Sequence, residues 1–190
     1  MRYLTASISI IALTTLSACS DGGAPAEDTP AVENDATSPT EAVIGTATLQ
    51  LADGTSAGTS VIQDTGTGIT IEADVQNIEP GPHGFHLHQT GSCDAPDFTS
   101  AGGHLNPTDK GHGTLSPDGA HVGDLPNIDI GTDGTGTLSG LIEGTAAQVT
   151  EWLFDDDGTA VMVHAGPDDY KTDPSGDAGA RVACGVLTRP

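Results

Sequence analysis

Two histidines separated by a single residue, in the segment His86-Leu87-His88, constrain this chain more than any other feature. Side chains alternate between the two faces of a β-strand, so both imidazoles point the same way when this segment is extended. Two neighbouring rings on one face offer two nitrogen ligands to a single metal ion. The spacing therefore predicts a β-strand that carries a two-nitrogen metal clamp.

A second group of candidate ligands lies in the segment GGHLNPTDKGHGTLSPDGAHVGD, residues 102–124. Its glycines and prolines predict a long irregular loop, and metal ligands would give such a loop a reason to be ordered. Three nitrogens and one carboxylate oxygen suit tetrahedral zinc better than a redox copper. The loop is therefore interpreted as a zinc cage, with the candidate ligands His104, His112, His121 and Asp124.

His164 follows the run Thr159–Val163, whose β-branched content predicts a strand. This strand can bring His164 back to the clamp as a further ligand, for copper. All seven histidines lie between residues 83 and 164, and the chain has only five Lys and Arg residues. The histidines are therefore not part of a solvent-exposed charged surface. A single histidine is more often a hydrogen-bonded polar residue, but the whole pattern favours a metal centre.

The remaining sequence predicts an all-β domain. Alternating apolar runs are punctuated by Gly, Asp-Gly and Asn, which is typical of short antiparallel strands; these runs are Ile44–Leu51, Thr67–Val75, Gly134–Ile142 and Ala180–Leu187. No convincing amphipathic helix is predicted, apart from an ambiguous stretch near Ala146–Phe154. Aromatic residues make up only 3% of the chain, so the core has to be built from aliphatic side chains. Trp152 and Phe154 are expected in that core, with an exposed interface as the alternative.

The N-terminal residues predict export. Residues 1–18 carry Arg2 and then the apolar run ISIIALTTL, which is a signal peptide too short to remain as a membrane-spanning helix. Leu16-Ser17-Ala18-Cys19 resembles the cleavage box of bacterial lipoproteins, which makes Cys19 the lipidated end of a periplasm-facing protein of the cell envelope. Ser20 favours the outer membrane under the sorting rule that this resemblance suggests.

Residues 19–42 are acidic and rich in Pro, Ala and Thr, so we expect a flexible tether, with the folded domain at residues 43–190. The formal net charge of the chain is −22, and removal of a signal peptide whose one charged residue is Arg2 makes it −23. A charge of this sign excludes nucleic acid as a partner.

Five stretches resemble those of the copper/zinc superoxide dismutases, in the order and spacing of that family. They are GFHLHQTGSCD (84–94), AGGHLNP (101–107), HVGDLPN (121–127), VHAGPDD (163–169) and GDAGARVACGV (176–186). The resemblance covers about residues 43–190. It implies an immunoglobulin-like Greek-key β-sandwich or barrel with long metal-binding and electrostatic loops.

The resemblance also implies a role for each candidate residue, with one copper ion and one zinc ion per subunit. The copper ligands would be His86, His88, His104 and His164, and the zinc ligands would be His104, His112, His121 and Asp124, with His104 shared between the two metals. Asp168 would accept hydrogen bonds from one histidine of each metal. Cys93 and Cys184 would form a disulfide, which in the chain-entropy model stabilises the fold by about 4.5 kcal/mol. His83 matches a position that is not a ligand, and we expect it in the core, packed and hydrogen-bonded.

The implied activity is the dismutation of superoxide to dioxygen and hydrogen peroxide, an antioxidant oxidoreductase reaction. Arg181 would hold the substrate anion beside the copper, and His104 would supply a proton. Net charge opposes the approach of an anion, so the positive potential of the metals and Arg181 has to dominate within about 8–10 Å. Lys110 and Lys171 can guide the substrate or merely promote solubility. The alternative function is a non-catalytic module that binds or buffers copper and zinc, and a homodimer is a further expectation.

Overall fold

The computed structural model describes residues 41–190. The predicted signal peptide, the lipidation site Cys19 and nearly all of the predicted tether lie outside the described residues. The first strand already begins at Ala42, one residue before the predicted start of the domain. Within residues 41–190, no helix has the length and apolar character that crossing a membrane requires.

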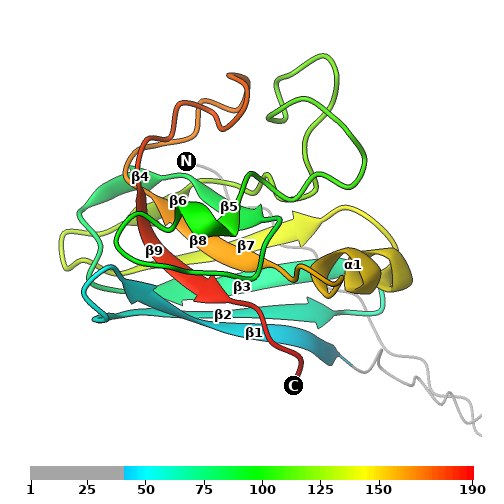
Figure 1. Ribbon diagram of the computed structural model, residues 1–190, viewed down its shortest axis with the longest axis horizontal. Coiled ribbons are helices and arrows are strands. Elements are labelled where there is room, and N and C mark those ends of the chain that lie inside the picture. Colours follow the sequence, from blue (N-terminus) through cyan, green and yellow to red (C-terminus); the bar gives the residue numbers. More distant parts are fainter. Residues whose placement is uncertain (1–40) are drawn as a thin grey trace, which may run out of the picture. The chain divides into compact units, whose positions relative to one another are not determined.

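A seven-stranded antiparallel sheet forms most of the domain (Figure 1). Its spatial order is β5, β8, β9, β1, β2, β3, β7, and a two-stranded sheet pairs β4 with β6. The strands span Ala42–Leu51 (β1), Ser56–Asp64 (β2), Ile69–Val75 (β3), Gly81–His83 (β4), Phe85–His88 (β5), Ile128–Ile130 (β6), Gly136–Ile142 (β7), Ala160–His164 (β8) and Arg181–Val186 (β9).

Alternation of apolar and polar residues explains why these segments form strands. In β3, the inward positions Ile69, Ile71, Ala73 and Val75 are buried, whereas Glu72 and Asp74 between them are exposed. The four predicted strand ranges agree with β1, β3, β7 and β9 to within two residues at each end. Antiparallel pairing in the register Ile71 to Ile62 and Ile71 to Gly140 then builds one continuous apolar face.

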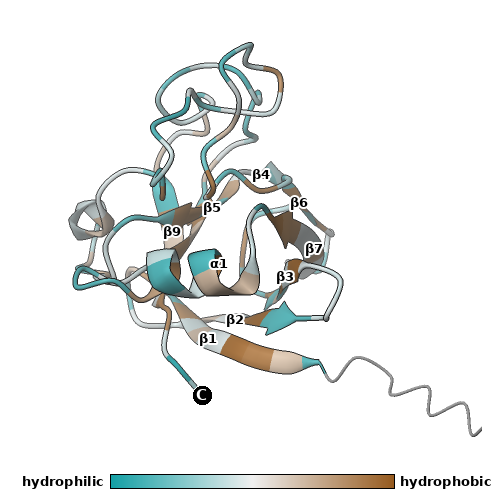
Figure 2. Cartoon of the chain, turned by 90° about the vertical axis from the view of Figure 1, so that its right-hand side faces the viewer, coloured by the Kyte–Doolittle hydropathy of each residue, from teal (hydrophilic) through white to brown (hydrophobic). Residues whose placement is uncertain are grey.

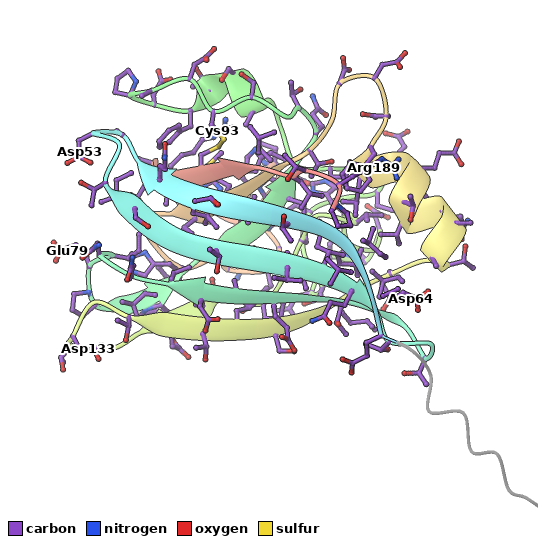
Figure 3. The ribbon with its side chains drawn as sticks, turned by 90° about the horizontal axis from the view of Figure 1, so that it is seen from below. Asp53, Asp64, Glu79, Cys93, Asp133 and Arg189 are labelled. Atoms are coloured by element: carbon purple, nitrogen blue, oxygen red, sulfur yellow. A yellow bond between two sulfur atoms is a disulfide. The ribbon has the colours of Figure 1, made fainter. Side chains whose placement is uncertain are left out.

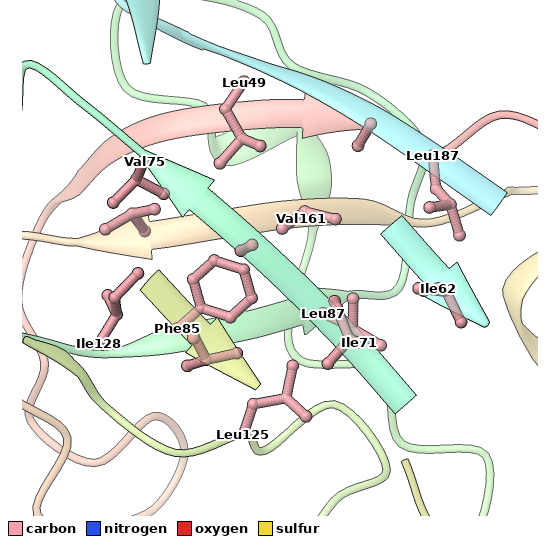
Figure 4. Packing of buried hydrophobic residues seen from close by; sticks show 14 of the residues in the cluster. Leu49, Ile62, Ile71, Val75, Phe85, Leu87, Leu125, Ile128, Val161 and Leu187 are labelled. Atoms are coloured by element: carbon pink, nitrogen blue, oxygen red, sulfur yellow. The ribbon is translucent and has the colours of Figure 1, made fainter. Parts of the chain in front are cut away.

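The sheet curls into a half-barrel around this face. β4 and β5 are consecutive strands on either side of Gly84, and β4 pairs with β6 in the register His83 to Ile128. The turn between β6 and β7, closed by a hydrogen bond from Gly131 N to Thr135 O of 2.8 Å, then leads to the far edge of the large sheet. Phe85 and Leu87 fill the centre of the core, and Figure 4 shows them among side chains from the other strands. The all-β Greek-key prediction is confirmed.

The ambiguous stretch after β7 forms an α-helix, α1, at Ala146–Leu153. Thr145 caps it: its side chain accepts a hydrogen bond from Gln148 N, and the Gln148 side chain accepts one from Thr145 N, which is a capping box. Val149 and Leu153 are buried, and Figure 2 shows the hydrophilic residues of α1 on its outer side. Trp152 and Phe154 are partly buried and pack against the core, as predicted.

Two long loops extend from the same side of the half-barrel, where Figure 1 shows them above the strands. Between the short 3₁₀ helix Thr99–Ala101 and β6, residues 102–127 contain no helix or strand, which confirms the predicted irregular loop. The second loop, residues 165–180, joins β8 to β9. The candidate metal ligands lie where these loops meet β5 and β8.

Candidate metal centre

β5 presents its two histidines on the face away from the core. Phe85 and Leu87 belong to the apolar core, and His86 and His88 alternate with them. Both histidines are almost completely buried, with 0% and 1% of their surface exposed, under the two loops rather than under the sheet. The two histidines therefore lie on one face of the strand, as the period of two predicted.

Backbone hydrogen bonds fix the long loop against β5. Leu105 N donates to Leu87 O at 2.8 Å, and Leu87 N donates to Gly123 O at 2.9 Å. Position 123 has no room for a side chain, because an added Cβ would lie 2.3 Å from Leu87 O. The loop therefore runs beside β5 twice, and this places His104 and Asp124 next to the clamp.

Four histidines converge above β5 and β8, namely His86, His88, His104 and His164, and we call them the four-histidine group. One nitrogen atom of each lies within 4.8 Å of the others. β8 pairs with β5, and His164 at its end donates its backbone N–H to Gly84 O at 2.9 Å. The strand return that the sequence predicted for His164 is therefore present.

Hydrogen bonds set which nitrogen of each ring in the four-histidine group can bind a metal. His88 Nδ1 lies 3.0 Å from Gly102 O, and His164 Nδ1 lies 3.2 Å from Gly179 O. A ring nitrogen that faces a carbonyl oxygen must carry the proton, so the Nε2 lone pairs of both rings are free. These two Nε2 atoms lie 3.4 Å apart and face the centre of the group.

Asp124 is the centre of a second cluster, the aspartate group, which comprises His104, His112, His121 and Asp124. The Nδ1 atoms of the three histidines lie 2.8, 3.1 and 3.1 Å from a single oxygen, Asp124 Oδ1. The other oxygen accepts hydrogen bonds from Gly113 N at 2.7 Å and His121 N at 2.9 Å, so the backbone fixes the carboxylate. His104 belongs to both groups, as the resemblance implied.

Asp168 joins the two groups from the loop 165–180. Its Oδ2 accepts a hydrogen bond from His86 Nε2 at 2.8 Å, and its Oδ1 accepts one from His112 Nε2 at 2.9 Å. Both contacts leave the Nδ1 lone pair of each ring pointing into its group. The side chain of Asn127 holds the backbone of Asp168, because its Oδ1 accepts from Asp168 N at 2.8 Å and its Nδ2 donates to Asp168 O at 2.9 Å, a contact that the sequence did not reveal.

The donor atoms fit metal ions. His86 Nδ1, His104 Nε2 and His112 Nδ1 are buried and have no hydrogen-bond partner among the described residues, and such atoms are costly unless a ligand satisfies them. Around tetrahedral zinc with bonds of about 2.0–2.1 Å, donor atoms are about 3.3 Å apart. The 2.8 and 3.1 Å separations around Asp124 Oδ1 need only small movements to admit such an ion.

The protonation states also fit metal binding. Burial lowers the pKa of His88 to about 2 and that of His164 to about 3, so both rings are neutral at physiological pH. Burial also lowers the pKa of His104, to about 4, although its hydrogen bond with Asp124 opposes this shift. The pKa of His112 rises to about 9 despite burial, because the carboxylates of Asp124 and Asp168 lie beside its ring and favour the protonated form. A cation in the aspartate group takes the place of that proton.

Arg181 lies beside the four-histidine group, in a cross-strand pair with His164. Its guanidinium donates from Nη1 to Phe98 O at 2.6 Å and from Nη2 to Gly102 O, the same carbonyl that faces His88 Nδ1. A pocket of about 370 Å³ opens here, lined by Arg181 and the histidines His88, His104, His121 and His164. The pocket therefore places one fixed positive side chain next to both metal groups.

The other basic and histidine candidates lie elsewhere. Lys110 and Lys171 do not line the pocket of Arg181. His83 is 4% exposed, with Nδ1 at 2.7 Å from His164 O and Nε2 at 2.8 Å from Glu79 O. His83 is therefore the packed, hydrogen-bonded residue that the sequence predicted.

Cys93 and Cys184 form the predicted disulfide, which Figure 3 shows beside the label of Cys93. Cys184 lies in β9 and is buried in a small apolar cluster with Phe98 and Met162. The bond thus attaches the loop that contains Phe98 and Gly102 to the strand that begins with Arg181. Disulfides of this kind persist in oxidising compartments outside the cytoplasm.

An antiparallel half-barrel with two adjoining histidine-rich groups defines a β-structured protein with a dinuclear metal centre. The family model described as copper/zinc superoxide dismutase (SODC) matches residues 34–187, and this chain belongs to that family. Superoxide dismutase [Cu-Zn] 1 of Aquifex aeolicus is 42% identical over 139 residues, covering 70% of this chain and 81% of that protein. Superoxide dismutase [Cu-Zn] of Caulobacter vibrioides is 42% identical over 146 residues, covering 75% and 84%.

Solved structures agree with this membership. A SOD-like protein from Bacillus subtilis has a TM-score of 0.71 and 37% identity, covering 77% of this chain and 100% of that chain. The Cu/Zn superoxide dismutase from Brucella abortus has a TM-score of 0.61 and 30% identity, covering 78% and 99%. The family uses copper and zinc, and the two groups described above are where this chain can hold them.

Proposed function

We propose that this chain dismutes superoxide, with copper in the four-histidine group and zinc in the aspartate group. The ligand sets follow the groups in the structure: His86, His88, His104 and His164 for copper, and His104, His112, His121 and Asp124 for zinc. Three nitrogens and one carboxylate oxygen suit zinc, and an all-imidazole set suits copper. The observation that carries the proposal is the fixed guanidinium of Arg181 in the pocket shared with these histidines.

Bound copper supplies the one-electron redox chemistry, whereas bound zinc supplies charge and geometry. The overall reaction consumes two superoxide anions and two protons and yields dioxygen and hydrogen peroxide. His104 Nε2 is buried, without a hydrogen-bond partner among the described residues, and its ring lines the pocket. We assign to this nitrogen the role of holding the proton that is delivered to the product.

Arg181 binds and orients the substrate anion in this proposal. Two of its N–H groups are used by Phe98 O and Gly102 O, which fixes the plane of the guanidinium and leaves its other donors for an anion. Asp168 orients His86 and His112 so that their Nδ1 atoms face the metals. The chain thus supplies a prepared anion site and prepared ligands.

The test is superoxide decay after pulsed generation, measured on residues 43–190 loaded with one copper and one zinc. We expect fast copper-dependent decay, and Arg181→Ala should lower kcat/KM by about 10- to 100-fold, the cost of losing a charge-assisted hydrogen bond. Lys171→Ala is the matched control, because it removes the same unit charge outside the pocket.

Decay no faster than with free copper, despite full metal loading, would overturn the enzymatic proposal. That result would favour the second candidate, a module that binds or buffers copper and zinc without turnover. One relative makes this alternative concrete, since a Bacillus subtilis protein 43% identical over 123 residues is called superoxide dismutase-like rather than superoxide dismutase.

We also propose a location for the protein, supported by the sequence and the disulfide. Residues 1–18 act as a signal peptide, Cys19 carries lipid, and residues 19–42 tether the domain on the periplasmic side of a bacterial envelope membrane, with the outer membrane favoured. In a bacterial host, the full-length protein should be found with the membranes, and Cys19→Ala should move it to the soluble fraction. Equal fractionation of both proteins would contradict lipidation. The homodimer stays a prediction, which the mass in solution would check.

A further inference from the structure

A carboxylate lies close to the anion-binding arginine. Asp97 and Arg181 line one surface pocket of about 510 Å³ together with Gly179. Arg181 and Gly179 also line the pocket that contains the histidines. The two pockets therefore adjoin at Arg181, and an anion bound there lies within the field of Asp97.

The position of this carboxylate is fixed. Asp97 Oδ1 accepts hydrogen bonds from Thr99 N at 3.1 Å and Thr99 Oγ1 at 2.9 Å, whereas no hydrogen bond to Oδ2 is present among residues 41–190. The next residue, Phe98, presents its carbonyl to Arg181 Nη1 at 2.6 Å. The same short segment thus positions the guanidinium and places a negative charge near it.

Asp97 and Arg181 are close enough to influence each other without forming a contact ion pair. Burial lowers the pKa of Arg181, and the charge of Asp97 opposes this effect. Hydrogen bonds from Thr99 lower the pKa of Asp97, and Arg181 adds to that shift. Asp53 and Glu79 border another depression that Arg181 reaches, but Asp97 is the carboxylate that acts on its pKa.

We propose that Asp97 is a selectivity residue, whose carboxylate weakens anion binding at Arg181 in proportion to the charge of the anion. The inference rests on the proposed function, in which Arg181 binds superoxide. The free energy of repulsion between Asp97 and an anion is proportional to the charge of the anion. It is therefore twice as large for a doubly charged anion such as sulfate as for a singly charged anion such as superoxide. Asp97 would thereby keep abundant divalent anions out of the substrate pocket at a smaller cost to the monovalent substrate.

The size of the effect follows from Coulomb's law. For charges about 8 Å apart in water, removal of one negative charge changes the affinity by about two- to threefold per unit of ligand charge. Asp97→Asn should therefore tighten azide binding by about two- to threefold and sulfate binding by about four- to ninefold. Both changes should disappear at high salt, because screening acts on exposed charges.

The experiment uses the copper- and zinc-loaded protein. Azide affinity is measured from the absorption band that azide produces on the copper protein, and sulfate affinity from its competition with azide, at low and high ionic strength. Asp133→Asn is the matched control: Asp133 Oδ1 accepts from Thr135 N at 3.1 Å and Thr135 Oγ1 at 2.8 Å, the same cap as in Asp97. Figure 3 shows Asp133 on the opposite side of the domain from Cys93.

A second variant separates charge from structure. Thr99→Val removes the hydroxyl that holds Asp97 but keeps the carboxylate, so it should leave the ratio of sulfate to azide affinity nearly unchanged. An unchanged ratio in Asp97→Asn, the same change in Asp133→Asn or Thr99→Val, or no azide binding at all would overturn the inference. Failure of the proposed function has a different signature, the absence of copper-dependent superoxide decay in the unmodified protein.

Discussion

Asp168→Asn is expected to weaken copper binding by about 10- to 100-fold while zinc binding changes much less. The asymmetry follows from the partners of the two oxygens. Oδ1 accepts from both His112 Nε2 and Tyr170 N, at 2.9 and 2.6 Å, whereas within residues 41–190 Oδ2 accepts from His86 Nε2 alone, at 2.8 Å. The asparagine will keep its carbonyl oxygen at the position with two donors and turn its NH₂ group toward His86.

An NH₂ group opposite His86 Nε2 forces the proton of that ring onto Nδ1. Nδ1 is the atom that faces the four-histidine group, so the copper site loses a ligand, whereas the His112 tautomer is preserved. Competitive titration with chelators measures the two affinities separately. Asp169→Asn is the control, since Asp169 is a partly exposed carboxylate in the same loop that accepts from Lys171 N and Thr172 N. Equal losses at both metals would contradict this account.

Strand geometry could be predicted from sequence because it depends on a period of two. The alternation of Phe85 and Leu87 with His86 and His88 already separates a core face from a ligand face. Similarly, the β-branched run before His164 predicts β8. The stretch 146–154 was ambiguous because it is too short for its apolar residues to show a clear helical period. The capping box of Thr145 and Gln148 is the stronger indication of a helix.

The loop ligands are different, since their convergence depends on long-range backbone pairing. The positions of His104 and Asp124 depend on the hydrogen bonds of Leu87 with Leu105 and Gly123, which no local pattern encodes. The composition of the loop marked these residues as candidate ligands, the family resemblance implied their roles, and the structure brings them together. Their assignment to particular metals is part of the proposed function.

Carbonyl oxygens form the part of the site that sequence reasoning missed. Gly102 O and Gly179 O fix the tautomers of His88 and His164, and Phe98 O helps to hold Arg181. Every residue has a carbonyl group, so residue type carries almost no signal for such a role. The two glycines themselves were the available hint, since the backbone has a positive φ at both, 72° at Gly102 and 80° at Gly179, and glycine is favoured there.

Replacing both disulfide cysteines, Cys93→Ser with Cys184→Ser, is expected to cost about 4.5 kcal/mol of unfolding free energy, because the bond closes a loop with a sequence separation of 91 residues. Urea unfolding of the metal-free domain measures this cost. The double variant should also lose kcat/KM, since Phe98 O and Gly102 O then hold Arg181 less firmly.

Met162→Leu tests whether the disulfide or the packing around it stabilises this region. Met162 is fully buried in the same cluster as Cys184, and a swap of similar volume costs less than about 1.5 kcal/mol. If Met162→Leu destabilised the domain as much as the double variant, packing and not the cross-link would hold this region. If the double variant lost stability but kept kcat/KM, the disulfide would act on the fold alone, and the two carbonyl groups would suffice to hold Arg181. A loss of both in the double variant, with neither in Met162→Leu, is the result that we expect, because one covalent bond joins the loop that carries the carbonyl groups to the strand that carries the arginine.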